Sequence, residues 1–308
     1  MYKQFFGLRE APFSVNPDPR FLFMTDHSQE ALASLTYGIQ TRKGFILLTG
    51  EVGTGKTTLL NKMFDWLRGE RAATAFVFNS RLNTTQFLDF VMGDFGIHCE
   101  SGMKSQVLMR LNQWLLERYA AGESAVLVVD EAQNLSTQVL EEIRLLTNLE
   151  TSTDKLLQIV LCGQPELEMK LRQPQLRQLR QRITLRCRTH PLTVEETHGY
   201  VGERLRIAGA DSQLIFSPAA VDSIFKFARG IPRVINVICE HALINAFVDH
   251  ERPVGEVTIQ QVAADLELDQ DEAPGDGASV LETVQNARLM ETLQTLATMM
   301  DRLRKTEE

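Results

Sequence analysis

Short runs of apolar residues alternate, through the middle of the chain, with longer stretches in which apolar residues recur every three or four positions. The short runs predict strands, and the periodic stretches predict amphipathic helices. Strands are expected over residues 45–49, 75–79, 125–129, 156–162 and 183–187. Helices are expected between them, over residues 57–68, 85–95, 105–119 and 137–149. This alternation predicts an α/β fold, with helices covering both faces of a five-stranded parallel sheet.

The strand pattern stops after His190, and the chain from there to about residue 268 predicts helices only. Ser217 followed by Pro218 is typical of a helix start, because serine caps the free amides and proline fits the first helical position. Gly230 and Pro232 then separate this helix from the next. We therefore expect a core over residues 44–190 and a second, all-helical domain over residues 191–268.

The first 43 residues are rich in aromatic side chains and prolines. Proline removes a backbone donor and restrains the residue before it, so the opening segment cannot be one long helix. It is expected to form an arm that packs its rings on a neighbouring domain. A helix from about Ser28 to Thr41, capped by Ser28, is expected to follow it.

The last 40 residues divide into two parts. Residues 269–279 are acidic and small, which predicts a flexible linker. Residues 280–308 predict an amphipathic helix, which needs a partner or the body of the protein to stabilise it. Its apolar residues follow 4-3-4-3 spacing: Leu289, Leu293, Leu296, Met300 and Leu303.

Composition narrows the class of protein. The 308 residues carry a net charge of −8, which disfavours a protein whose main task is to coat nucleic acid. The four cysteines lack the CxxC spacing of a zinc or redox site, so buried reduced thiols are expected. The sequence has neither a membrane-spanning apolar run nor a signal peptide pattern at its start, which predicts a cytoplasmic location without a direct membrane span.

A phosphate-binding motif lies between the first predicted strand and its helix. Its spacing matches GxxxxGK[ST], in which glycines let backbone amides approach phosphate, the lysine neutralises it and the hydroxyl binds Mg²⁺. We expect Lys56 to contact the β- and γ-phosphates of ATP and Thr57 to bind Mg²⁺. The residues expected to line the nucleotide are Gly50, Glu51, Val52, Gly53, Thr54, Gly55, Lys56, Thr57 and Thr58.

Two carboxylates follow the third predicted strand. Asp130 and Glu131 would lie at the carboxyl edge of the sheet, beside the phosphate loop. Asp130 is expected to hold Mg²⁺, and Glu131 is expected to orient and polarise the attacking water. An acidic turn alone would be ambiguous, but its pairing with the loop predicts phosphoryl-transfer chemistry.

Weaker signals concern polar residues after the fourth strand and beyond. Gln164 could bridge the γ-phosphate and the carboxylates, although a turn residue would look the same. Several arginines flank the fifth strand, and one of them could stabilise transition-state charge in a neighbouring subunit. Arg233 begins a helix in the second domain and could sense the bound nucleotide. For the arginines that flank the fifth strand, an exposed, solvated helix face is an equally good explanation of some of the group.

The sequence resembles the AAA+ ATPases and, more narrowly, the general secretion pathway ATPases of the GspA/ExeA type. The residues that carry the resemblance are the opening YKQFFGL, Pro12-Phe13, Pro17-Asp18-Pro19, Tyr37-Gly38, the loop from Gly50 to Thr58, DEAQNL from Asp130 to Leu135, LRQRI from Leu179 to Ile183 and GIPRVIN from Gly230 to Asn236. The resemblance extends over roughly residues 1–268. As a set these motifs are specific, whereas the phosphate loop alone is shared by many families.

The resemblance implies a sheet with strand order 5-1-4-3-2, a helical lid, and a ring of identical subunits, such as a hexamer, with nucleotide between them. It implies Gln164 as the first sensor, Arg233 as the second sensor, and Arg180 or Arg182 as the arginine finger. Residues 16–20 would lie near the adenine. Secretion ATPases of this type continue into a membrane helix and a peptidoglycan-binding region, whereas a linker and a soluble amphipathic helix are expected over residues 269–308 here. Cell-wall binding and direct membrane anchoring are therefore not expected of this sequence.

Three functions remain open from the sequence. The first is a Mg²⁺-dependent ATPase that powers or regulates assembly of a secretion, exopolysaccharide or envelope export system, and reaches a membrane-protein partner, peripheral to the inner membrane, through residues 280–308. The second is an ATP-dependent DNA-binding regulator of transposition, similar to TnsC. The third is a scaffold that binds ATP without hydrolysing it, against which the Asp130-Glu131 pair argues.

Overall fold

The computed structural model describes residues 2–16, 18–78, 82–99, 102–210 and 214–268. The linker and helix expected over residues 269–308 lie outside these ranges. The chain forms two compact units. The α/β unit comprises Met24–Glu51 and Gly55–His190, and the helical unit comprises the described parts of Met1–Phe23, Val52–Thr54 and Pro191–Glu308.

A five-stranded parallel sheet forms the centre of the α/β unit. Its strand order, β2-β3-β4-β1-β5, is the order that the resemblance implies. The strands are β1 (Phe45–Thr49), β2 (Ala72–Val77), β3 (Ser124–Val129), β4 (Leu157–Gly163) and β5 (Leu185–Arg188). Every residue of β1 and β4 is buried, because these two central strands are covered on both faces.

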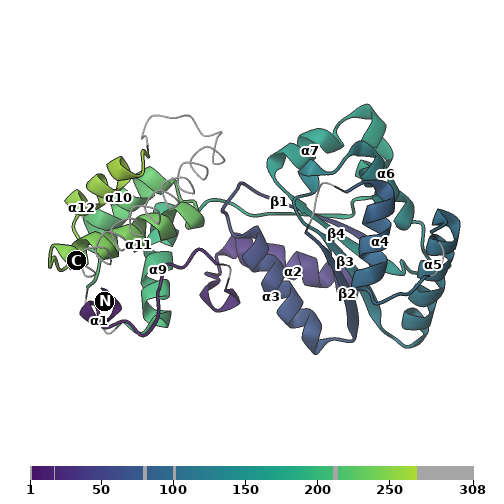
Figure 1. The fold of residues 1–308 in the computed structure, drawn as a ribbon, viewed down its shortest axis with the longest axis horizontal. Helices are drawn as coiled ribbons and strands as arrows, with labels where there is room; N and C mark the ends of the chain where they lie inside the picture. Colours follow the sequence, from purple (N-terminus) through teal and green to yellow (C-terminus); the bar gives the residue numbers. More distant parts are fainter. Residues whose placement is uncertain (1, 17, 79–81, 100–101, 211–213, 269–308) are drawn as a thin grey trace, which may run out of the picture. The chain divides into compact units, whose positions relative to one another are not determined.

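Helices cover both faces of the sheet (Figure 1). The helices α2 and α3 lie on one face, and α4, α5 and α6 lie on the other. The helical segments of this unit are α2 (Asp26–Gln40), α3 (Lys56–Gly69), α4 (Thr84–Asp94), α5 (Lys104–Ala120), η2 (Ala132–Asn134), α6 (Thr137–Leu146), α7 (Pro165–Leu171), η3 (Pro174–Leu176) and α8 (Arg177–Arg182). The predicted α/β class with a five-stranded parallel sheet is thus confirmed.

Helix α2 packs closely on the sheet and starts earlier than the sequence predicts. A Cβ added at Gly38 would come within 2.6 Å of side-chain carbons of Ile46 and Leu185, so this close approach requires glycine. The cap is Thr25 rather than Ser28. The Thr25 hydroxyl accepts from the Ser28 amide and the Ser28 hydroxyl accepts from the Thr25 amide, so Ser28 occupies the third helical position of a capping box.

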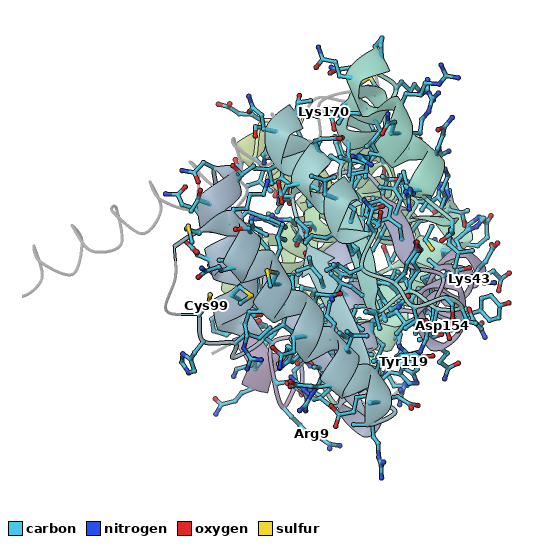
Figure 2. The ribbon with its side chains drawn as sticks, turned by 90° about the vertical axis from the view of Figure 1, so that its right-hand side faces the viewer. Arg9, Lys43, Cys99, Tyr119, Asp154 and Lys170 are labelled. Carbon is cyan, nitrogen blue, oxygen red and sulfur yellow. The ribbon has the colours of Figure 1, made fainter. Side chains whose placement is uncertain are left out.

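The far edge of the sheet, where the strands begin, is closed by polar side chains. The Tyr119 hydroxyl donates to Asp154 Oδ2 at 2.8 Å, and both side chains are labelled in Figure 2. The guanidinium carbon of Arg42 lies 4.9 Å from the centre of the Tyr119 ring. These contacts join α5 to the loop before β4. The candidate chemical groups lie at the opposite edge, where the strands end.

The helical unit has its own apolar core. It contains α1 (Tyr2–Phe5), η1 (Pro19–Phe21), α9 (Val194–Ile207), α10 (Pro218–Ala228), α11 (Pro232–Val248) and α12 (Glu256–Asp265). Ser217 caps α10 and Pro218 takes its first position, as the sequence predicts. Aromatic residues of the opening segment pack here: Phe6 and Phe13 are buried in the same core as α9 to α12.

A buried arginine anchors the opening segment within this unit. Arg204, on α9, donates from Nε to the Pro12 carbonyl at 2.6 Å and from Nη2 to the Ser14 carbonyl at 3.2 Å. Its guanidinium carbon also lies 4.7 Å from the centre of the Phe21 ring. The residue is only 5% exposed, so these hydrogen bonds are shielded from water.

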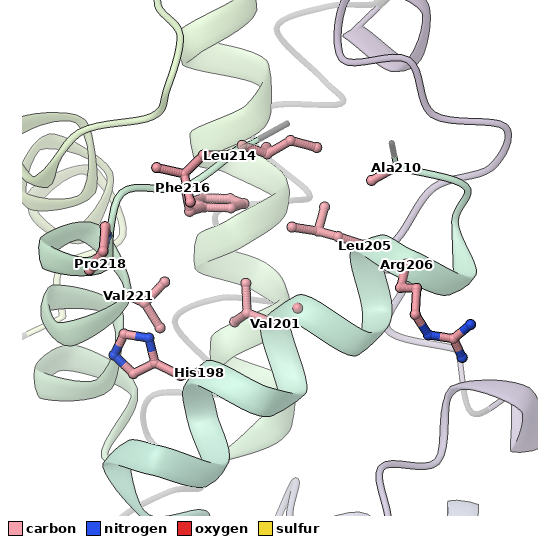
Figure 3. A pocket seen from close by; sticks show the side chains of 11 residues that line it. His198, Val201, Leu205, Arg206, Ala210, Leu214, Phe216, Pro218 and Val221 are labelled. Atoms are coloured by element: carbon pink, nitrogen blue, oxygen red, sulfur yellow. The ribbon is translucent and has the colours of Figure 1, made fainter. Parts of the chain in front are cut away.

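A shallow cavity of about 540 Å³ lies in the helical unit, between α9 and α10 (Figure 3). Its lining is mainly apolar, and the polar groups at its edge are already paired. His198 Nε2 lies 2.8 Å from Asp222 Oδ1, and Arg206 contacts Glu203 at 2.7 Å. None of the residues that the sequence predicts to bind or hydrolyse nucleotide lines this cavity.

Among the described residues, no helix combines the length and apolarity needed to cross a bilayer.

Candidate nucleotide-binding site

The loop between β1 and α3 starts at a tightly packed glycine. The Gly50 amide donates to the Gly163 carbonyl at 3.3 Å, which ties the loop to the end of β4. A Cβ added at Gly50 would come within 1.9 Å of Thr189 Oγ1, so no larger residue fits without a shift. The start of the loop therefore lies at the edge where β1, β4 and β5 end.

The loop ends at a helix start that no side chain caps. Gly55, the N-cap residue of α3, has φ 93°, a left-handed conformation that favours glycine, and it has no side chain that could accept a hydrogen bond from the first amides of the helix. A Cβ added at Gly55 would meet nothing within 4 Å. The first amides of α3 therefore border open space, and a helix N-terminus of this kind attracts anions.

Lys56 is buried within the same loop. Its ammonium donates to the carbonyl oxygens of Gly50, at 2.7 Å, and Glu51, at 2.9 Å. The side chain is 7% exposed, so the charge is held close to the loop rather than in bulk water. Thr57 and Thr58 follow it on the first turn of α3, with Thr57 exposed. The arrangement fits the binding of a polyphosphate.

The middle of the loop, Val52–Thr54, groups with the helical unit. In that unit the Arg233 amide donates to the Gly53 carbonyl at 3.2 Å. Arg233 occupies the first turn of α11, directly after Pro232. The second-sensor role of Arg233 remains a prediction.

Asp130 and Glu131 follow β3 at the carboxyl edge of the sheet. Asp130 is 9% exposed, and its Oδ1 accepts from the Glu131 amide at 2.9 Å. Burial raises the pKa of the Asp130 carboxyl above its ordinary value, and the Glu131 charge raises it further. The hydrogen bonds from the Glu131 amide and the Cys162 thiol, together with the Lys56 charge, lower the pKa of Asp130, but the net shift is upward.

Glu131 is held by two side-chain amides. Gln133 Nε2 donates to Glu131 Oε2 at 2.5 Å, and Gln164 Nε2 donates to the same oxygen at 3.2 Å. The structure thus brings Gln164 beside Glu131, and its role as first sensor stays a prediction. The contact with Gln133 has no counterpart in the sequence expectations.

The donor set around Asp130 fits Mg²⁺. Asp130 presents a buried carboxylate at the end of β3, and carboxylate and hydroxyl oxygens are the ligands that Mg²⁺ prefers. Thr57 presents an exposed hydroxyl on the first turn of α3. The described residues contain no cluster of three or more His, Cys, Asp or Glu side chains that could hold a metal by themselves. The ion would therefore depend on phosphate oxygens and water for its remaining ligands.

The two candidate finger arginines differ in their contacts. Arg182 Nη2 donates to Asn148 Oδ1 at 2.9 Å. Arg180 is exposed, and within the described ranges it makes no hydrogen bond or ion pair. Arg188, also in this group, is paired with Glu168 at 2.6 Å. Arg180 is therefore the candidate whose guanidinium remains available.

Comparison with protein-family models identifies one domain of the chain. A model of the AAA domain matches residues 39–171. That range contains the phosphate loop, the strand before it and the Asp130-Glu131 pair. The fold, the strand order and the family model agree, so the chain contains an AAA domain with the fold of P-loop AAA-type proteins.

Within that class, the chain is similar to General secretion pathway protein A of Aeromonas hydrophila. The two are 46% identical over 262 residues, which is 84% of this chain and 48% of the relative. The predicted resemblance to the GspA type is thus confirmed. The chain spans about half the length of that relative.

Solved structures share the fold at low sequence identity. Cdc6p from Pyrobaculum aerophilum superposes with a TM-score of 0.63 at 17% identity, covering 88% of this chain and 73% of that chain. The Aeropyrum pernix ORC2 protein, solved as ADPNP-ADP complexes, gives a TM-score of 0.61 at 15% identity, covering 83% of this chain and 71% of that chain. At such identity the likeness shows the fold alone.

Proposed function

We propose that this chain hydrolyses ATP with Mg²⁺, as an oligomeric ATPase that powers or regulates assembly of a secretion, exopolysaccharide or envelope export system. The observation that carries the activity is the convergence of the loop and the carboxylates on one sheet edge. The Gly50 amide bonds to Gly163, next to Gln164, whose side chain bonds to Glu131. Lys56 donates to the Gly50 carbonyl within the same loop.

Each residue has a distinct part in this proposal. The first amides of α3 and Lys56 bind the β- and γ-phosphates. Glu131 orients the attacking water or accepts a proton from it. Mg²⁺, held by Thr57 and Asp130, would neutralise charge on the phosphate oxygens. Gln164 fixes the position of Glu131 near the γ-phosphate. Arg180, from a neighbouring subunit, would stabilise the charge that develops on the transferred phosphoryl group.

The pathway and the assembly rest on the relative. The name of that relative refers to general secretion, and 46% identity over 262 residues supports a related role for this chain. We propose a homo-oligomeric ring in the cytoplasm that reaches the inner membrane through a membrane-protein partner. The partner would bind residues 280–308, and loss of partner binding in a chain ending at Ser279 would support this assignment.

The activity is tested by ATP turnover and ATP affinity measured with Mg²⁺. Glu131→Gln should keep ATP affinity and lower turnover by about 10²-fold or more, because a positioned base contributes at least that much. Lys56→Ala should lose affinity, while Lys62→Ala, an exposed lysine on the same helix, should change neither. Absence of ATP binding by the wild type would refute the proposal, and turnover that requires duplex DNA would favour a DNA-bound regulator instead.

A further inference from the structure

Glu131 has an unusual backbone conformation for its residue type. Its φ and ψ are 51° and 37°, in the left-handed region, where a residue with a Cβ is disfavoured. Such a conformation persists only when the surrounding contacts hold it. It turns the chain sharply after β3 and starts η2, so that the side chain of Gln133 comes back beside that of Glu131.

The amide of Gln133 is oriented by two contacts at once. Its Oε1 accepts from the Gln164 backbone amide at 3.2 Å, and its Nε2 donates to Glu131 Oε2 at 2.5 Å. A flipped amide would place oxygen against a carboxylate and nitrogen against an N–H donor, losing both bonds. Gln133 therefore links the loop after β3 to the residue after β4.

Space for this amide depends on a glycine. A Cβ added at Gly163 would lie 2.7 Å from Gln133 Oε1 and 2.8 Å from Leu167 Cδ2. Any side chain at position 163 would therefore displace the Gln133 amide or the Leu167 side chain. The small residue at the end of β4 allows Gln133 to reach both of its partners.

The backbone of the Gln133 segment is anchored as well. Lys170, on α7 and labelled in Figure 2, donates to the Gln133 carbonyl at 2.9 Å and to the Leu135 carbonyl. Burial lowers the pKa of Lys170, because its ammonium is partly removed from water. Helix α7 also begins directly after Gln164. One short helix therefore anchors the backbone at Gln133 and begins directly after Gln164.

We propose that Gln133 is a positioning residue for ATP hydrolysis, which with Gln164 fixes Glu131 through Oε2 and leaves Oε1 for the attacking water. Within the described residues, no side chain or amide bonds to Glu131 Oε1. This inference rests on the proposed ATPase function. It adds that turnover depends on a side chain that touches neither the nucleotide nor the water.

The test uses the full chain and measures turnover, ATP affinity and thermal stability for each variant. Gln133→Ala should lower kcat by about tenfold or more, since a catalytic group misplaced by a fraction of an ångström loses rate, while ATP affinity stays within about twofold. Gln133→Glu keeps the shape and an acceptor for the Gln164 amide but removes the donor to Glu131, so it should lose as much. Gln138→Ala, an exposed glutamine on α6, is the matched control and should behave as wild type.

A double variant distinguishes positioning from general damage. Gly163→Ala should lower kcat in the wild-type background, because it displaces the Gln133 amide, and should have a much smaller effect on kcat in the Gln133→Ala background. Additive losses of kcat in the double variant, or a loss of ATP affinity and thermal stability that parallels the loss of kcat, would overturn the proposal.

If wild type hydrolyses ATP and Glu131→Gln does not, while Gln133→Glu is fully active, only this inference fails. If Glu131→Gln is as active as wild type, the proposed role of Glu131 itself fails.

Discussion

The hydroxyl of Thr49 donates to the carboxylate of Glu168 at 2.7 Å. Thr49 is the last residue of β1, directly before the phosphate loop, and Glu168 lies on α7, four residues after Gln164. Arg188, the last residue of β5, binds the same carboxylate at 2.6 and 3.0 Å. Glu168 therefore connects the ends of two strands to the helix that follows Gln164.

Replacement of Glu168 should weaken the fold in a pH-dependent manner. Desolvation raises the pKa of Glu168, but the hydrogen bonds from Arg188 and Thr49 and the nearby arginine charges together lower it by more. The net shift is therefore downward from 4.5. A lowered pKa stabilises the fold above pH 4.5, and this contribution is lost as pH falls through the folded-state value. Glu168→Gln should lower the free energy of unfolding by about 1–2 kcal/mol at pH 7.

Urea unfolding at several pH values checks this expectation. The difference between wild type and Glu168→Gln should shrink as the pH falls below 4.5. Glu166→Gln, an exposed glutamate on the same helix, is the control. A difference that stays constant from pH 7 to acid conditions would show that the ion pair contributes nothing.

The contacts of the arginines predict which one acts between subunits. Arg180→Ala should lower ATP turnover by about 10²-fold or more without weakening ATP affinity, because a guanidinium supplied in trans stabilises only the transition state. Arg182→Ala removes a bond to Asn148 and should mainly affect stability. Mixing Arg180→Ala subunits with Glu131→Gln subunits should restore part of the turnover, at interfaces where both intact residues meet. Failure of the mixture to recover any activity would argue against Arg180.

Arg204 should be essential to the helical unit. Arg204→Met removes the donors that satisfy the Pro12 and Ser14 carbonyls in a buried site, which should cost at least about 2 kcal/mol of unfolding free energy. Arg206→Met, two residues later, alters only an exposed pair with Glu203 and should be nearly neutral. Thermal unfolding and protease cleavage of the first 23 residues would measure both. Equal stability of the two variants would contradict the anchoring role.

The thiols should differ strongly in reactivity. Cys162, Cys187 and Cys239 are buried, and burial raises the pKa of Cys187 to about 11, so few thiolates form there at pH 8. Cys99 is half-buried. A thiol-specific disulfide reagent should therefore modify Cys99 alone in the native protein and all 4 cysteines after denaturation. Rapid native labelling of a Cys99→Ser variant would contradict the burial of the other three.

The patterns of apolar residues predict the class of fold because each element has a clear period. The central strands β3 and β4 agree closely with the predicted runs. At the edge strand β2 the prediction was shifted, since the structure starts it at Ala72 rather than at residue 75. Residues 72–74 are Ala, Ala and Thr, whose weak apolarity gives no strand signal, and pairing with β3 extends the strand over them.

The sequence predicts those parts of the candidate site in which a motif fixes the spacing of residues along the chain. It does not predict side-chain contacts that depend on the geometry of a turn. The loop and the Asp130-Glu131 pair follow strands whose ends must share one edge of a parallel sheet. Nothing in a spacing of two residues predicts that Gln133 bonds to Glu131, because the contact depends on a left-handed backbone at Glu131. The roles of Glu168 and Lys170 likewise depend on how α7 packs, which the sequence pattern of seven residues does not specify.

The packing of the opening segment also constrains the order of events during synthesis. Tyr2 donates to Glu240 at 2.7 Å, across a separation of 238 positions in the chain. The aromatic residues of the opening segment therefore find their partners only after α9, α10 and at least half of α11 have been made. Until then Phe6 and Phe13 have no core to enter, and a nascent chain with such exposed rings is prone to aggregation or chaperone capture.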